Sequence, residues 1–189
     1  MIRIAVVGDI GSGKSYVAKQ FGYPVFNADK EVVKIYKENI KCFKKLKKIF
    51  PKYIISFPIN KKELCQTIMG GKNNINKIIK IIHPEVRLRM NKFIKKNKKK
   101  KIIVLDIPLL LEGKINNKKD VLIFVDAKKK EINKRLKKRL NFNKKIFSKL
   151  KKLQLPLEIK KKKSDFIIKN NFKTFFIKKS VKNILKQIL

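Results

Sequence analysis

A glycine-rich segment near the start of the chain carries the clearest chemistry of the sequence. Residues 8–15, GDIGSGKS, fit the pattern G-x-x-x-x-G-K-[S/T] in full. In such a loop the glycines let consecutive backbone N–H groups point at phosphate oxygens, while the lysine reaches the β- and γ-phosphates and the hydroxyl residue ligates Mg²⁺. The predicted nucleotide-binding residues are Gly8, Gly11, Ser12, Gly13, Lys14, Ser15 and Tyr16, with Ser15 as a metal ligand.

Two aspartates stand where short apolar runs end. Asp29 closes the segment FNAD, and Asp106 follows the apolar residues 102–105. Asp106 is placed like a Walker-B acid, so it could hold Mg²⁺ through water or orient an acceptor, and both roles stay open. Asp29 could also cap the helix expected after it, a role compatible with catalysis.

The elements that must position these residues alternate between strands and helices. Residues 2–7 form a β-branched and apolar run, interrupted only by Arg3, before the glycine loop, and residues 14–21 are compatible with a helix. Further strands are expected at residues 25–26, 102–105, 121–125 and 166–168, and a closing helix at residues 177–189. This alternation predicts an α/β protein whose parallel sheet is covered by helices on both faces and binds ligands at the carboxyl ends of its strands.

The length and composition indicate one cytoplasmic domain. A chain of 189 residues matches a single domain, and no stretch approaches the roughly 18 apolar residues of a membrane span. The apolar start, residues 1–7, is too short for a signal peptide. Cys42 and Cys65 are far apart without histidines at metal-ligand spacing, so neither a zinc site nor a disulfide framework is expected.

The charge is unusually positive. Lys and Arg number 52 against 13 Asp and Glu, a formal net charge of +39 that is typical of nucleic-acid binding. The lysines are spread over the chain together with many Ile, Asn and Phe, which favours compositional drift over a specific partner. We therefore interpret the lysine runs at residues 98–101, 128–130 and 160–163 as solvated helix ends and loops, and expect no specific nucleic acid.

Six segments, in order, resemble the dephospho-CoA kinase family. They are GDIGSGKS at residues 8–15, FNAD at 26–29, HPEVR at 83–87, LDIPLLLE at 105–112, RLKKR at 135–139, and QLP at 154–156 followed by SDFIIKN ending at Asn170. The resemblance implies a P-loop NTPase fold with ATP and dephospho-CoA as substrates. It also implies transfer of the γ-phosphoryl group of ATP to the ribose 3′-hydroxyl, the last step of coenzyme A synthesis.

The resemblance also implies roles for single residues. Lys14, Asp29 and Arg139 would be catalytic, with Asp29 orienting the acceptor hydroxyl and accepting its proton late, since the transition state of phosphoryl transfer is loose. Arg135 and Arg139, one helical turn apart, would lie in a lid over ATP. Two sets complete the assignment: substrate-binding residues Asp29, His83, Arg87 and Asp106, and nucleotide-binding residues Arg135, Arg139 and Asn170.

His83 and Pro84 are predicted to start a helix, with Pro84 at its first position and Arg87 one turn on. A single dephospho-CoA-kinase-like domain is expected over residues 1–189, with a core at 1–29, 99–127 and 164–189, a helical substrate-binding insertion at 30–98 and a lid at 128–163. Glu112 is a weaker polar candidate for the site.

Several residues depart from the family pattern. Asp9 stands where the family usually has Gly, Asn27 replaces a usual Asp, Tyr16 replaces a usual Thr, and no Gly follows the Asn170 segment. A carboxylate beside phosphates repels them unless it points outward or pairs with a lysine. Two other functions stay open: another small-molecule kinase, of nucleoside-monophosphate or shikimate type, or a nucleotide-gated nucleic-acid-binding protein.

Overall fold

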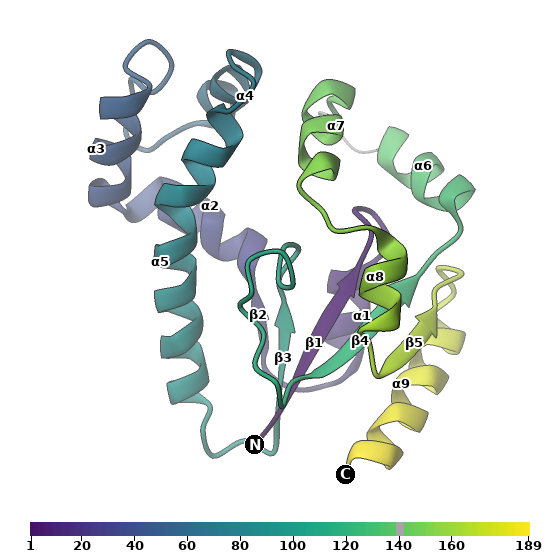
Figure 1. The fold of residues 1–189 in the computed structure, drawn as a ribbon. Helices are drawn as coiled ribbons and strands as arrows, with labels where there is room; N and C mark the ends of the chain where they lie inside the picture. Colours follow the sequence, from purple (N-terminus) through teal and green to yellow (C-terminus); the bar gives the residue numbers. More distant parts are fainter. Residues whose placement is uncertain (139–141) are drawn as a thin grey trace. The chain divides into compact units, whose positions relative to one another are not determined.

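A five-stranded parallel sheet forms the centre of the first of two structural units (Figure 1). The computed structural model describes residues 1–138 and 142–189. The first unit comprises residues 1–27, 94–142 and 151–189, and the second comprises residues 28–93 and 143–150.

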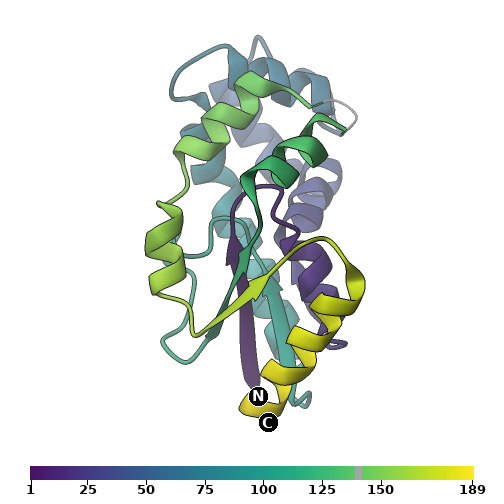
Figure 2. The same cartoon turned by 90° about the vertical axis from the view of Figure 1, so that its right-hand side faces the viewer.

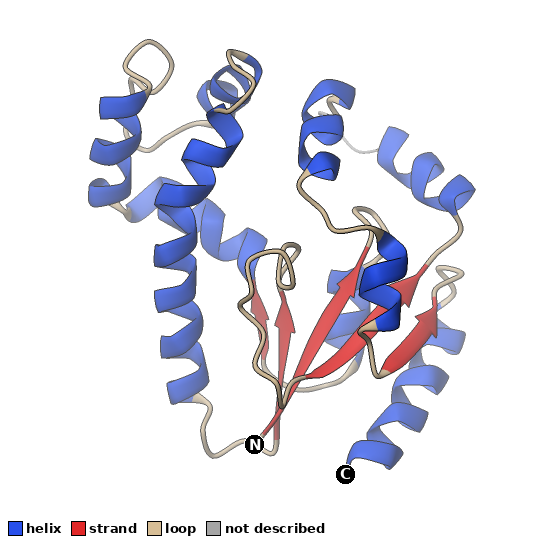
Figure 3. Ribbon diagram, viewed as in Figure 1, coloured by secondary structure: helices blue, strands red, loops and turns tan. Residues whose placement is uncertain are grey.

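The strands lie in the order β2-β3-β1-β4-β5, and every neighbouring pair is parallel (Figure 3). Their branched and aromatic side chains are buried along most of the central strands, as expected for a parallel sheet covered on both faces. The strands are β1 (Ile2–Gly8), β2 (Val25–Asn27), β3 (Ile102–Asp106), β4 (Val121–Asp126) and β5 (Phe166–Lys169).

Helices cover both faces of this sheet. Helices α1 (Lys14–Gln20) and α9 (Thr174–Ile188) pack side by side on one face, where Val17, Ile177 and Val181 join strand residues in one buried cluster. Helix α8 (Leu157–Lys162) lies against the other face, opposite α1 and α9 (Figure 2). Closing such a core removes the apolar faces of strands and helices from water at the same time.

Two further helices follow β4 along the chain. Helix α6 (Lys129–Lys137) begins three residues after β4 and buries Ile132 and Leu136. Helix α7 (Lys144–Lys152) buries none of its side chains fully, and its two ends belong to different units. Both are short and basic, so they depend on tertiary contacts rather than on helix propensity alone.

The second unit is helical. Its helices are α2 (Ala28–Glu38), α3 (Ile40–Ile49), α4 (Lys61–Met69) and most of α5 (Asn74–Lys96), together with residues 143–150. The Asn39 side chain accepts the N–H of Cys42 at the start of α3, which satisfies a free donor of the first turn. An ion pair from Arg89 to Glu31 at 3.3 Å links α5 to α2. A second ion pair, from Arg89 to Glu85 at 3.2 Å, joins residues one turn apart within α5.

The predicted helix start at Pro84 is wrong. Pro84 lies inside the 23-residue helix α5, ten residues after the helix begins. A proline in a helix interior supplies no N–H to the carbonyl four residues earlier and costs about 3 kcal/mol. The helix continues because one face is buried along its length, through Ile75, Ile78, Ile82, Val86 and Met90.

Among the described residues, none of the helices combines the length and the apolar character that crossing a membrane requires.

Candidate active site

The phosphate loop joins β1 to α1 and depends on backbone conformations that favour glycine. Gly11 and Gly13 have φ values of 88° and 92°, and Gly8 has a φ of 147°. A Cβ on Gly8 would lie 2.7 Å from the carbonyl oxygen of Val125, and one on Gly13 would collide with the side-chain amide of Asn170. These glycines are therefore required both by conformation and by space.

Lys14 is buried at the start of α1. Its Nζ donates to the backbone oxygen of Asp9 at 2.8 Å, and the N–H of Ser12 donates to the same oxygen at 3.1 Å. Ser15 follows in the first turn of α1 and is exposed. The loop thus surrounds the Lys14 ammonium and is followed by the exposed residue Ser15, an arrangement that suits phosphate and metal binding.

Asn170 connects the phosphate loop to β5, which is an edge strand of the sheet. It directly follows β5, and its Nδ2 donates to the backbone oxygen of Ser12 at 2.7 Å. Its Oδ1 accepts the N–H of Phe172, which turns the chain back towards the loop. Phe172 has a φ of 62°, in the left-handed region that favours glycine, so the backbone keeps this turn although the residue is aromatic.

Arg135 lies over the ring of Phe172. Its guanidinium carbon is 4.4 Å from the ring centroid, the geometry of a cation–π contact. Helix α6 also packs on the loop, because a Cβ on Gly11 would lie 3.1 Å from Ile132 and 3.2 Å from Leu136. The structure thus brings Arg135, Asn170 and the phosphate loop together, although Ser12 and Asn170 are 158 positions apart in the sequence.

Asp106 ends β3, in register with Val6 of β1 and Asn27 of β2. It is 2% exposed, and its Oδ2 accepts a hydrogen bond from Nδ2 of Asn27. Asn27, which departs from the family pattern, therefore supports this carboxylate. The Ser15 hydroxyl and the Asp106 carboxylate are hard oxygen donors, and their chemistry fits Mg²⁺.

The two remaining departures from the family pattern also have partners. The Tyr16 hydroxyl lies 2.7 Å from the hydroxyl of Thr174, the first residue of α9, and so joins α1 to α9. The Asp9 carboxylate accepts the N–H of Ile10 at 2.7 Å and lies 3.6 Å from Nζ of Lys151.

Glu112 has a partner that we did not expect. Its Oε1 lies 2.6 Å from Nζ of Lys160 and accepts the N–H of Leu155 at 2.9 Å. The interpretation of residues 160–163 as solvated is wrong for Lys160, which is 1% exposed. A buried lysine needs a paired carboxylate, and Glu112 supplies it.

Three predicted site residues lie in the second unit. Asp29 is in the first turn of α2, two residues after β2 ends. His83 and Arg87 lie one turn apart on α5, where His83 is partly buried and Arg87 is exposed. Burial, and then the charge of Arg87, lower the pKa of His83 below 6.5, so the imidazole is neutral at pH 7.

Arg139, predicted to be catalytic, lies outside the described residues. The sequence interpretation missed Phe172 and Lys151 as neighbours of the loop. For Phe172 the missing glycine after Asn170 was a usable signal, whereas Lys151 is one of 52 basic residues and nothing in its sequence context distinguishes it.

Comparisons with known proteins agree on one family. The family model for dephospho-CoA kinase matches residues 2–175. The dephospho-CoA kinase of Wolbachia pipientis wMel is 33% identical over 190 residues, covering 98% of this chain and 97% of that protein. The dephospho-CoA kinase of Bartonella quintana is 34% identical over 170 residues, covering 87% of each chain.

Solved structures share the fold. A Thermus thermophilus structure has a TM-score of 0.79 at 24% identity, and covers 100% of this chain and 98% of its own. The dephospho-CoA kinase from Campylobacter jejuni has a TM-score of 0.64 at 24% identity, over 98% and 96% of the chains. A shikimate kinase from Bacteroides thetaiotaomicron has a TM-score of 0.53 at 13% identity, over 99% of this chain and 98% of its own. Together with the parallel sheet, these neighbours confirm the expected P-loop NTPase fold.

The family match spans nearly the whole chain, and it includes the phosphate loop and the end of β5 that the fold brings together. The chain belongs to the dephospho-CoA kinase family.

Proposed function

We propose that this protein transfers the γ-phosphoryl group of ATP to the ribose 3′-hydroxyl of dephospho-CoA, giving coenzyme A and ADP. The observation that carries this proposal is a complete phosphate loop, with Lys14 buried in it, in a chain that matches the dephospho-CoA kinase family over residues 2–175. We also propose that the reaction takes place in the cytoplasm.

In this proposal the first unit binds ATP. The backbone N–H groups of the loop and the Lys14 ammonium hold the β- and γ-phosphates, and Arg135 and Arg139 neutralise charge on the transferring group. Ser15 and Asp106 would hold Mg²⁺, which when bound shields the charge of the phosphates. Arg135 already rests on Phe172, two residues beyond Asn170, so a flat cation and an aromatic ring stand beside the loop.

The acceptor side of the reaction belongs to three residues of the second unit. Asp29 orients the 3′-hydroxyl and takes its proton late in the transfer, a task for which a carboxylate of ordinary basicity suffices. Arg87 can make two parallel hydrogen bonds to a phosphate of dephospho-CoA or stack on its adenine. His83, neutral at pH 7 because of its lowered pKa, can donate or accept one hydrogen bond.

The test is ADP release with ATP and Mg²⁺, measured with dephospho-CoA, AMP, shikimate or no acceptor, with the mass of each product checked. We expect turnover with dephospho-CoA alone and a product heavier by one phosphoryl group. Lys14→Ala should abolish turnover, and Lys19→Ala, which removes an exposed lysine from the same helix, should not. Preference for AMP or shikimate would contradict the proposed acceptor.

A further inference from the structure

Asp9 is the second residue of the phosphate loop, and its carboxylate is buried. Its side chain is only 9% exposed, and its Oδ1 accepts the N–H of the next residue, Ile10, at 2.7 Å. The backbone oxygen of the same residue accepts the Lys14 ammonium. Asp9 is therefore a buried charge of the loop and not a surface charge.

A negative charge at this position works against the binding of a polyphosphate. Two like charges a few ångströms apart repel by about 1 kcal/mol in water and by several times that at the lower effective dielectric near a protein surface. A chain with a carboxylate at this position therefore needs a compensating cation to bind a polyphosphate well.

Lys151 is placed to provide it. It lies in the last turn of α7, within the first unit, and its Nζ is 3.6 Å from Oδ2 of Asp9. The side chain is 46% exposed, so the pair is partly screened by water and salt. Asp9 and Lys151 are 142 positions apart, and the fold alone brings them together.

We propose that Lys151 is a positioning residue for ATP binding in this chain: it neutralises Asp9 and so removes the repulsion between that carboxylate and the phosphates of ATP. The proposal rests on the proposed function, because it concerns the same nucleotide site. It assigns Lys151 no contact with ATP, and its effect should therefore disappear once the charge of Asp9 is removed.

The test is a double-mutant cycle on ATP affinity, measured by calorimetry with Mg²⁺ and without acceptor. Lys151→Ala should raise the Kd for ATP roughly five- to tenfold, more at low salt than at high salt. Asp9→Asn keeps an oxygen for the N–H of Ile10 but removes the charge, and adding it to Lys151→Ala should restore most of the lost affinity. Lys152→Ala, which removes the neighbouring exposed lysine, should change Kd by less than about twofold.

Two results would overturn the proposal: an unchanged Kd in Lys151→Ala, or an equal loss from Lys151→Ala with and without Asp9→Asn, which would instead indicate direct contact with phosphate. Thermal melting of each variant separates lost affinity from lost folding. ATP binding without turnover would contradict the proposed function only, whereas absence of ATP binding by the unmutated chain would contradict both.

Discussion

For Asp29, the sequence motif, the position after β2 and the proposed chemistry all agree. It follows β2 by two residues, in the first turn of α2, and we propose a catalytic role for it. Its proposed task is to orient a hydroxyl group and to accept the proton of that group. Both steps need the negative charge and basicity of a carboxylate, and not only a side chain of the same shape. An asparagine at this position keeps the shape and loses the basicity.

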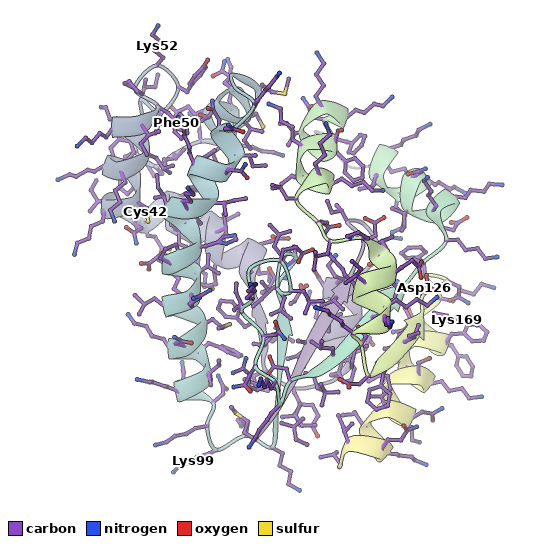
Figure 4. The ribbon with its side chains drawn as sticks, viewed as in Figure 1. Cys42, Phe50, Lys52, Lys99, Asp126 and Lys169 are labelled. Carbon is purple, nitrogen blue, oxygen red and sulfur yellow. The ribbon has the colours of Figure 1, made fainter. Side chains whose placement is uncertain are left out.

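We therefore expect Asp29→Asn to lower kcat with dephospho-CoA on the order of 10²- to 10⁴-fold, while the Kd for ATP changes little. The measurement is steady-state turnover together with calorimetric ATP binding. Asp126→Asn is the matched control: Asp126 is the last residue of β4 and is labelled in Figure 4. Its carboxylate pairs at 3.7 Å with Lys161. Near-normal turnover of Asp29→Asn would remove the assignment.

His83 can be followed without ambiguity because the chain contains a single histidine. Burial disfavours its charged form, and the nearby Arg87 disfavours it further, so its pKa in the folded protein lies below 6.5. In the unfolded chain the pKa of His83 is about 6.5, so between that pH and the lower folded pKa the unfolded chain binds more protons than the folded one. The stability of the fold therefore falls as the pH drops from about 6.5 through the folded pKa.

A proton NMR titration should accordingly give one imidazole resonance with a midpoint below 6.5. Arg87→Ala should move that midpoint upwards, but not fully to 6.5, because burial remains. Saturating dephospho-CoA should also raise the midpoint if its phosphates bind near His83, since an anion favours the imidazolium. A midpoint unaffected by dephospho-CoA would contradict substrate binding at His83.

At the scale of elements, Glu112 connects the segment after β3 to α8 and to the residues just before that helix. It receives both the Lys160 ammonium and the N–H of Leu155, which joins two segments that are about 45 positions apart in the sequence. The side chain of Lys160 is 1% exposed and that of Glu112 is 11% exposed, so removing either partner leaves a charge that is largely shielded from water. Such a loss costs far more than the pair itself contributes.

Lys160→Met should therefore lower the free energy of unfolding by roughly 3–5 kcal/mol, and adding Glu112→Gln should recover part of the loss. Urea unfolding followed by circular dichroism measures both variants. Lys162→Met, at an exposed position of the same helix, should stay within about 0.5 kcal/mol of the unmutated chain. An equally small effect for Lys160→Met would show that the pair is not buried in solution.

The strands could be predicted because their signal is local. Residues such as Ile4, Val6 and Val104 occur in unbroken apolar runs, and a run of that kind is buried wherever a parallel sheet is covered on both faces. The phosphate loop was predictable for the same reason, since its glycines, Lys14 and Ser15 are consecutive. Motif and element lie in the same short stretch of sequence.

Features that depend on distant partners could not be predicted. Helix α5 continues through Pro84 because its buried face outweighs one lost hydrogen bond, and local rules favour a helix start there instead. Lys160 and Lys151 look like any other lysine until Glu112 and Asp9 are placed beside them. Arg135 over Phe172 likewise requires α6 and the end of β5 to be placed first.

At the scale of the whole molecule, the net charge of +39 is the property that the proposed reaction does not require. The described structure explains only a few lysines through specific pairs, such as Lys160 with Glu112 and Lys34 with Glu31. A charge this large attracts any polyanion, whatever the fold, and the favourable free energy of binding comes from released counterions rather than from base contacts.

If the lysines serve no specific nucleic acid, binding to duplex DNA should be weak, indifferent to sequence and independent of ATP. We expect two unrelated duplexes to bind with equal affinity, and both affinities to fall steeply between about 50 and 200 mM salt, by a factor on the order of 10³ or more. Fluorescence anisotropy with and without ATP and Mg²⁺ measures this. Binding that persists at the higher salt, prefers one duplex or requires ATP would instead assign the lysines to a nucleic-acid partner, because counterion release alone produces none of these behaviours.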